Sequence, residues 1–588
     1  MIRTINGFIL AHGVFALAMM SILAWVAGFS AVTVALNVLL VVAIYSFVSI
    51  GLQTIVPLQR KLKVLILSVL TFLLVVTYVV NIVANHFWHN NVSFMFIYSY
   101  ASDLKGMLAD VSGGYTLIII FLIVLFTLIV LAYRSSLFAV IKWESRPTKG
   151  EVFLPLCISG ILALYLFFGF SHDDPGLWQG EPITSLSLDN AGLNYVSFER
   201  QLVDVNSTQG EIAKASESDY PTIVFMHLDA IRADHMSVYG YERETTPLLS
   251  EWVAKHGAVI KNNLSICSES VCGLVSAMSG QRERDLTDRS FVHNYLKENA
   301  DYTNYFFLTG SFDYGRIDAV LKQDVDFLSR ADREPSYNIH DDNIILDGIQ
   351  QIPVYSGDPN FFLFRYMSSH PMGRHFERFK EYKPNKKNLL SLMFPSLEGE
   401  IANNAADNNI LQMDHFINES LDLLAAKGYL QNFIVVIYGD HGDALGEHGY
   451  YGHYRGLYQE EVRTPLVILS SYDLSNIDTE YSTLNDIVPT VLELAGLKPA
   501  IEYEGISLLR QHDNRWTYHY SKTGVYANVW RRAGKLYKYI WFDDSYKKEA
   551  ELYELHSDPQ EMINLVSREQ VVVESMQAKL FAYFELNN

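Results

Sequence analysis

Two short apolar runs, about two hundred residues apart, each end in residues that can bind a metal. Residues 433–438 (FIVVIY) are typical of a buried strand, and the run DHGDALGEHG (440–449) follows them after one glycine. Residues 222–226 (TIVFM) are a second such strand, and HLDAIRADH (227–235) follows. Chemistry in α/β proteins collects at the carboxyl ends of parallel strands. The acidic residue Asp229 can meet the pair Asp440–His441 only if both strands lie in one sheet, so the sequence predicts a divalent-metal site at that edge.

Longer segments around these runs carry a family resemblance. They are LDAIRADHMSVYGYERETTP (228–247), the DHGDALGEHG run with His453 twelve residues after His441, LYQEEVRTPL (457–466), KLYKYI (535–540) and ELYELHSDPQEMINL (551–565). In this order they resemble the alkaline phosphatase superfamily, specifically its sulfatase-like branch with the lipid A phosphoethanolamine transferases and lipoteichoic acid synthases. The resemblance covers roughly residues 221 to 565. It implies an α/β/α sandwich on a mostly parallel sheet with a small carboxyl-terminal α+β segment.

The amino-terminal part has a different character. The net charge is −20, yet residues 1–170 carry nine Lys or Arg and only four Asp or Glu, so the remainder carries −25. A helix needs about 20 apolar residues to span a bilayer, and five such runs occur, near 8–28, 31–52, 64–84, 115–133 and 152–170. Basic residues cluster in the loops after the second and fourth runs, which favours a cytoplasmic position for both loops. The sequence therefore predicts five spans with the large carboxyl-terminal domain on the outer face.

These observations give a domain plan. We expect a five-helix transmembrane domain at 1–170, a linker at 171–220, a sulfatase-like catalytic domain at 221–509 and a carboxyl-terminal subdomain at 510–588. The resemblance implies a multi-pass protein of the bacterial inner (plasma) membrane, with its catalytic domain on the periplasmic or extracellular side. The acidic outer part makes nucleic acid an unsuitable partner, because nucleic-acid binding relies on positive charge.

The family's chemistry implies a nucleophile in the segment 263–280 (NLSICSESVCGLVSAMSG). Spacing to Gly280, where the sulfatase motif ends, selects Ser270, with Ser268 as the rival hydroxyl; both could instead cap the helix that follows. The sulfatase signal for converting this residue to formylglycine is absent, so an unmodified hydroxyl is expected to attack. Cys267 and Cys272 could close a local disulfide in an oxidising compartment, and the sequence leaves that open.

The resemblance also implies the metal ligands Asp229, Ser270, Asp440 and His441. Typical sulfatases have two adjacent aspartates where this chain has Asp229 and Ala230, and the transferases have Glu at the first position. A mixed oxygen and nitrogen set suits zinc or manganese better than calcium. A serine hydroxyl is a weak nucleophile until a cation lowers its pKa, so a divalent metal cofactor is expected.

Two further histidines match family positions that contact the transferred group. His453 keeps the transferase spacing from His441, and His370 in MSSHP (367–371) resembles a GSHGP segment. Both are predicted to be catalytic, by hydrogen bonding to phosphoryl oxygens or by protonating a leaving group; an ordinary surface or core histidine is the alternative. Arg316 matches an anion-binding position only loosely.

Three other residues of the motifs are assigned structural roles. Arg232 and Asp234 are expected to tie the turn after the first strand to its neighbours. His448 is expected to support the metal loop, the run at 440–449, without binding the metal.

The leading hypothesis is a transferase that takes a phosphoryl-linked headgroup, phosphoethanolamine or phosphoglycerol, from a membrane phospholipid. It would hold the group on Ser270 and pass it to an envelope glycolipid or glycan. The first alternative is a membrane-anchored hydrolase of sulfate or phosphate esters, which the two carboxyl-terminal segments favour. The second alternative is a non-catalytic lipid sensor, against which the retained metal-binding residues argue.

Overall fold

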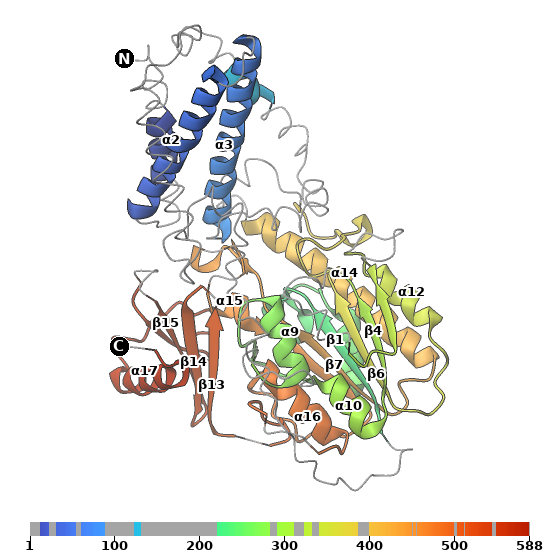
Figure 1. Cartoon of the computed structure of the whole chain (residues 1–588). Helices are drawn as coiled ribbons and strands as arrows, with labels where there is room; N and C mark the ends of the chain where they lie inside the picture. Colours follow the sequence, from blue (N-terminus) through green and yellow to red (C-terminus); the bar gives the residue numbers. More distant parts are fainter. Residues whose placement is uncertain are drawn as a thin grey trace. The chain divides into compact units, whose positions relative to one another are not determined.

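The chain divides into two compact units, residues 1–193 and 194–588 (Figure 1). The computed structural model describes residues 12–22, 31–54, 60–88, 123–130, 220–282, 291–310, 323–331, 340–385, 399–449, 451–453, 456–498, 503–510, 512–521, 523–543 and 548–586.

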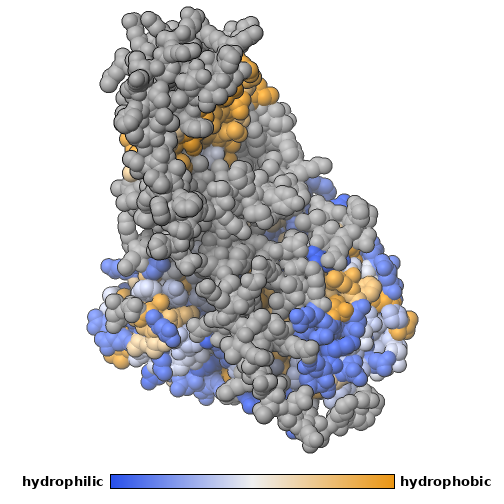
Figure 2. Space-filling view, viewed as in Figure 1, coloured by the Kyte–Doolittle hydropathy of each residue, from blue (hydrophilic) through white to orange (hydrophobic). Residues whose placement is uncertain are grey.

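The described part of the amino-terminal unit is helical. It comprises a helix at His12–Ile22, α2 (Ala31–Thr54), α3 (Arg60–Trp88) and a helical stretch at 123–130. Buried apolar residues join them, among them Met20, Val41 and Leu67. Their visible surface is hydrophobic in Figure 2.

The five predicted spans are only partly described. Within the described residues, one helix is long and apolar enough to cross a membrane, over Leu65–Ile82. The second and third predicted spans coincide with α2 and α3. The span predicted at 152–170 and the linker up to residue 219 lie outside the described residues, so the five-span topology stays a prediction.

The second unit is built on a seven-stranded mixed sheet in the order β2-β11-β7-β1-β6-β4-β5. Five neighbouring strands, from β7 to β5, are parallel, and β11 runs antiparallel to β7. The strands are β1 (Thr222–Leu228), β2 (Gly257–Val259), β4 (Thr303–Leu308), β5 (Phe327–Arg330), β6 (Asn360–Tyr366), β7 (Phe433–Gly439) and β11 (Leu466–Ser470). The mostly parallel α/β sheet expected from the sequence is therefore confirmed.

Helices cover both faces of this sheet (Figure 1). Along β1 the buried side chains alternate between the faces, because successive residues of a strand point to opposite sides. Ile223 and Phe225 pack with α9 (Ser270–Ser279), α10 (Val292–Ala300) and α16 (Ile487–Leu494). Val224 and Met226 pack with α8 (Pro247–His256), α12 (Asn343–Gln351) and α14 (Gly399–Ala426). This arrangement is an α/β/α sandwich.

A four-stranded antiparallel sheet follows the sandwich in the chain. It consists of β13 (Asn514–Ser521), β14 (Val525–Arg532), β15 (Lys535–Phe542) and β16 (Glu551–Glu554), with α17 (Gln570–Phe584) packed on it. Strand β13 reaches the segment before α9, because Tyr520 N–H donates to the Ile266 carbonyl at 2.9 Å and His519 Nδ1–H to the Ser265 carbonyl at 2.8 Å. The second sheet thus supports the segment that leads to the predicted nucleophile.

Candidate metal centre and nucleophile

The register of two parallel strands brings the two acidic motifs together. Strand β1 pairs with β7 so that Leu228 lies beside Gly439, and Asp229 and Asp440 follow at the same edge. Ala230 has a left-handed backbone (φ 54°), and its N–H donates to Asp440 Oδ1 at 3.1 Å. A non-glycine residue held in this conformation costs energy and is common at functional sites. The turn after β1 is therefore locked to the carboxylate after β7.

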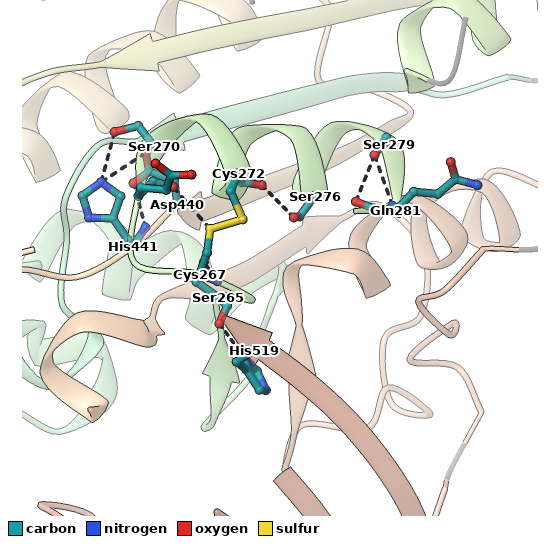
Figure 3. Close-up of a disulfide and its surroundings, with 11 residues drawn as sticks. Ser265, Cys267, Ser270, Cys272, Ser276, Ser279, Gln281, Asp440, His441 and His519 are labelled. Atoms are coloured by element: carbon teal, nitrogen blue, oxygen red, sulfur yellow. Dashed lines mark hydrogen bonds and ion pairs between the residues drawn. A yellow bond between two sulfur atoms is a disulfide. The ribbon is translucent and has the colours of Figure 1, made fainter. Parts of the chain in front are cut away.

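Helix α9 presents Ser270 to the same place. Glu269 precedes the helix in an extended conformation, and Ser270 is the first helical residue. Ser270 Oγ lies 3.1 Å from His441 Nε2 (Figure 3). The same oxygen lies 3.5 Å from Asp229 Oδ1. The N-cap residue of α9 is Glu269, so neither Ser268 nor Ser270 occupies the N-cap position.

A disulfide joins Cys267 to Cys272 across this helix start (Figure 3). The disulfide that the sequence left open is therefore formed, and the segment from Cys267 to Cys272, which contains Ser270, is a covalently closed loop.

In both His441 and Asp440, one side-chain atom is hydrogen-bonded to the backbone. His441 Nδ1–H donates to the Gly442 carbonyl at 2.7 Å, because a carbonyl can only accept, which leaves the lone pair of Nε2 facing Ser270. Asp440 Oδ1 accepts the N–H groups of Ala230 and His441, the latter at 2.8 Å. The second oxygen, Asp440 Oδ2, lies 3.8 Å from His441 Nε2.

The distances between the inward atoms fit a small cation. Ligands about 2.0–2.2 Å from a tetrahedral zinc lie roughly 3.2–3.6 Å from one another. The inward atoms of Ser270, Asp229, Asp440 and His441 are separated by 3.1 to 3.9 Å in the four pairs that have a measured contact. His227, Asp229 and Asp440 also form a group that could hold a metal. The donor set therefore fits a divalent cation.

Burial and charge set the protonation states of this cluster. Burial opposes ionisation of Asp229 and Asp440, and their proximity adds to that opposition at Asp229. Arg365, His370 and His441 outweigh both effects and hold the pKa of Asp229 below its usual value. The neighbouring histidines and N–H groups lower the pKa of Asp440 in the same way. Both carboxylates are thus ionised at neutral pH, as metal binding requires.

Two histidines complete the lining of the centre. His370 Nδ1 accepts the N–H of Met372 at 3.1 Å, so its proton resides on Nε2, which lies 4.0 Å from Asp229 Oδ1. Burial lowers the pKa of His370 to about 4, so the ring is neutral at pH 7. His453 Nδ1–H donates to the Asp443 carboxylate at 2.9 Å, and its ring lies 4.3 Å from that of His441 between centroids. The structure thus places His370 near Asp229 and His453 near His441, and Asp229 and His441 both contact Ser270 Oγ.

The residues expected to be structural lie beside the centre. Arg232 Nη1 binds Glu447 at 2.6 Å and Nη2 binds Asp234 at 2.7 Å, which ties the β1 turn to the metal loop. His448 Nδ1–H donates to Glu460 at 2.7 Å, and its ring stacks on a tyrosine. The rival Ser268 is buried, and Arg316 lies outside the described residues.

Three residues of the site were missed from the sequence, namely His227, Arg365 and Asp443. His227 Nε2 lies 3.0 Å from Asp440 Oδ2, and Arg365 forms an ion pair with Asp229 Oδ2. Strand register places His227 beside Arg365, so both are in one row across the sheet. A polar residue just before the end of each apolar strand was the signal that could have found them, and Asp443 stood inside the metal-loop motif.

Comparisons with known proteins agree with this geometry. Residues 221–497 match the family described as Sulfatase, and residues 446–585 match the family described as N-sulphoglucosamine sulphohydrolase, C-terminal. An α/β/α sandwich with a metal centre at the carboxyl edge of its parallel strands is alkaline phosphatase-like. Residues 221–497 are thus a sulfatase-like domain, consistent with the alkaline phosphatase superfamily.

Individual relatives are of two kinds. An arylsulfatase of Clostridium perfringens is 28% identical over 173 residues, 28% of this chain and 35% of that protein. Phosphatidylethanolamine transferase Mcr-1 of Escherichia coli is 28% identical over 247 residues, 39% of this chain and 44% of that protein. The chain thus matches less than half of the length of either relative.

One solved structure extends the likeness over most of the chain. The integral membrane protein lipooligosaccharide phosphoethanolamine transferase A of Neisseria meningitidis has a TM-score of 0.51 and 18% identity. The match covers 84% of this chain and 95% of that protein, and at this identity it speaks for the fold alone.

Proposed function

We propose that this protein is a membrane-bound, metal-dependent transferase that moves a phosphoryl-linked headgroup from phospholipid to an envelope glycolipid or glycan through a covalent Ser270 intermediate. The observation that carries the proposal is the position of an unmodified serine hydroxyl 3.1 Å from His441 Nε2 and 3.5 Å from Asp229 Oδ1. The five predicted spans add support, because a transferase with a phospholipid donor works at the bilayer. The proposed location is the inner membrane, with the catalytic unit on its outer side.

In the first half-reaction, Ser270 Oγ attacks the phosphorus of the donor headgroup. The Oγ–P bond forms, and the P–O bond to the diacylglycerol breaks. Ser270, Asp229, Asp440 and His441 would hold the cation, zinc or manganese, which supplies Lewis-acid chemistry by lowering the pKa of the serine hydroxyl and polarising a phosphoryl oxygen. His370 donates its Nε2–H toward the phosphoryl group, since its other nitrogen is held by the Met372 N–H.

In the second half-reaction, a hydroxyl of the acceptor attacks the phosphoserine. His453 is the proposed base, because the Asp443 carboxylate accepts from its Nδ1–H and so sets the tautomer in which Nε2 is the basic nitrogen. The acceptor O–P bond forms, the Ser270 Oγ–P bond breaks, and the proton ends on Ser270. In the first half-reaction the proton moves the other way: His453 Nε2 takes the Ser270 hydroxyl proton and passes it to the diacylglycerol oxygen as the P–O bond breaks.

Mass spectrometry of the full-length protein after incubation with phosphatidylethanolamine or phosphatidylglycerol tests the proposal. A headgroup-sized adduct on Ser270 is expected in the wild type and absent from Ser270→Ala. Ser268→Ala is the matched control and should keep the adduct. Loss of the adduct in Ser268→Ala but not in Ser270→Ala would move the nucleophile to the rival serine.

A hydrolase of sulfate or phosphate esters is the second candidate. The match of residues 446–585 to a sulphohydrolase carboxyl-terminal family favours it. In that case water replaces the acceptor hydroxyl beside His453. Release of free phosphate or sulfate from esters, without an adduct from phospholipid, would establish this alternative.

A further inference from the structure

Arg365 is a largely buried cation beside the candidate metal centre, and the proposed reaction gives it no role. Its side chain is 12% exposed, and its partner Asp229 is 2% exposed. Nη2 donates to Asp229 Oδ2, while Nη1 donates to the Thr309 carbonyl at 2.8 Å. The guanidinium is therefore fixed at two ends, by the residue after β1 and by the residue after β4.

The backbone around the guanidinium is shaped to admit it. Gly310 adopts a left-handed conformation (φ 80°), and a Cβ atom at this position would collide with Arg365 Nη1. Both the left-handed backbone and the lack of room for a Cβ atom favour glycine at position 310. The pocket beside Asp229, lined by Thr309 and Gly310, thus fits the Arg365 guanidinium.

The position of the Arg365 guanidinium limits which carboxylate oxygen of Asp229 can bind a metal. Asp229 Oδ2 faces a guanidinium that is charged at every accessible pH, so a cation that used this oxygen would lie against a fixed positive charge. Asp440 Oδ1 is likewise taken, by the N–H groups of Ala230 and His441. Asp229 is therefore left with one oxygen, Oδ1, on the side away from the guanidinium, while the remaining oxygen of Asp440, Oδ2, lies 3.0 Å from His227 Nε2.

We propose that Arg365 is a metal-selectivity residue: by holding Asp229 Oδ2 it makes Asp229 a one-oxygen ligand and favours a small four-coordinate cation over calcium. The proposal rests on the proposed metal-dependent function. Zinc sites take four ligands, whereas calcium takes six to eight oxygens and uses carboxylates through both atoms. The two backbone donors at Asp440 cannot be removed by substitution, so Arg365 is the side chain that can be tested.

Metal binding to the full-length protein, stripped with EDTA and titrated separately with zinc chloride and calcium chloride, tests the proposal. The quantity is the zinc-to-calcium ratio of the two association constants, which measures zinc preference and is obtained from equilibrium dialysis with elemental analysis. Loss of one positive charge strengthens the binding of both divalent cations similarly, so the ratio isolates ligand geometry. Substituting a residue that orients a metal ligand changes affinity about 10- to 100-fold, and the zinc preference of Arg365→Met is expected to fall by about tenfold or more.

A matched control separates this effect from the loss of any buried arginine. Arg531, on β14 of the second sheet, forms an ion pair with Asp478. Their side chains are 16% and 7% exposed, close to the values for Arg365 and Asp229. Arg531→Met should leave the zinc-to-calcium ratio as in the wild type. An unchanged ratio in Arg365→Met, or an equal change in Arg531→Met, would overturn the proposal.

Arg365→Lys provides a second variant that keeps the charge. One ammonium group lacks the two-sided fork that holds Thr309 and Asp229 together, so an intermediate ratio is expected. Should Arg365→Met fail to fold, Arg365→Lys decides: a lowered ratio supports the proposal and a wild-type ratio refutes it. No phospholipid enters this measurement, so absence of the Ser270 adduct and absence of the selectivity change are separate outcomes.

Discussion

Gly273 gives the sharpest test of how closely α9 must approach the metal loop. A Cβ atom on Gly273 would lie 2.5 Å from the Asp440 carbonyl oxygen and 2.8 Å from Asp440 Cβ. Ordinary contacts begin at 3.4 Å, so Gly273→Ala must move the helix or the loop by about 0.9 Å. Because Ser270 starts this helix and His441 follows Asp440, the displacement separates the nucleophile from its partner.

The expected magnitude follows from two opposing effects. Replacing a helical glycine by alanine favours the helix by about 1 kcal/mol, while overpacking a buried site costs about 1–3 kcal/mol, so the net loss of stability is small. A misplacement of about 1 Å at a reacting centre can lower the rate roughly 100-fold. Gly273→Ala should therefore fold with a melting temperature near that of the wild type and react about 100-fold more slowly.

The assay is the rate of Ser270 modification by phospholipid, or of ester cleavage, measured beside a thermal melt. Gly399→Ala is the matched control, because Gly399 begins α14 and its added Cβ would meet no atom of the described residues within 4 Å. If Gly273→Ala reacts within about twofold of the wild type at equal stability, then the close approach of α9 to Asp440 does not set the geometry of the site.

Three further tests address the buried charges. His519 is fully buried, and burial lowers its pKa to about 3. In the unfolded chain the imidazole is protonated below about pH 6.5, so the folded protein loses about 1.4 kcal/mol of stability per pH unit as the pH falls from 6.5 toward 3. His519→Phe should therefore make the melting temperature less dependent on pH over that range. Lys538 and Glu561 pair at 2.9 Å with side chains 1% and 0% exposed. Lys538→Met leaves the buried Glu561 carboxylate without its ion-pair partner and should lower the free energy of unfolding, from thermal or denaturant unfolding, by about 3–5 kcal/mol. The double variant Lys538→Met with Glu561→Gln should recover most of that loss. EDTA should lower the melting temperature of the wild type, since a cation at 100 times its dissociation constant adds about 2.7 kcal/mol to the stability of the folded state. In Asp440→Asn this shift should be much smaller. An equal shift in both proteins would place the cation elsewhere.

The larger features of the catalytic unit follow from local patterns. The runs at 222–226 and 433–438 are apolar enough to be inner strands, and the turn residues after them mark where each strand ends. Parallel pairing of these strands was expected from the acidic residue that follows each of them, and β1 does pair with β7. Ser270 was selected by its spacing in a motif, and α9 brings it to His441.

The finer features of the site depend on contacts that no local pattern encodes. Arg365 lies 136 positions from Asp229 in the chain, and only the register of β1 with β6 makes them neighbours. The disulfide from Cys267 to Cys272 needed the loop conformation, because a separation of five residues is compatible with open and closed geometry alike.

The sequence by itself determined the class of fold, the edge of the sheet that carries the chemistry and the residue types available there. Those properties depend on hydrophobic period and on the residues that end each strand, which act over a few positions. Tertiary structure alone decided which oxygen of each carboxylate faces the centre, which nitrogen of each histidine carries the proton, and that a guanidinium fills the space beside Asp229. These depend on hydrogen bonds between groups far apart in the chain, and their geometry exists only once the sheet and its helices have packed.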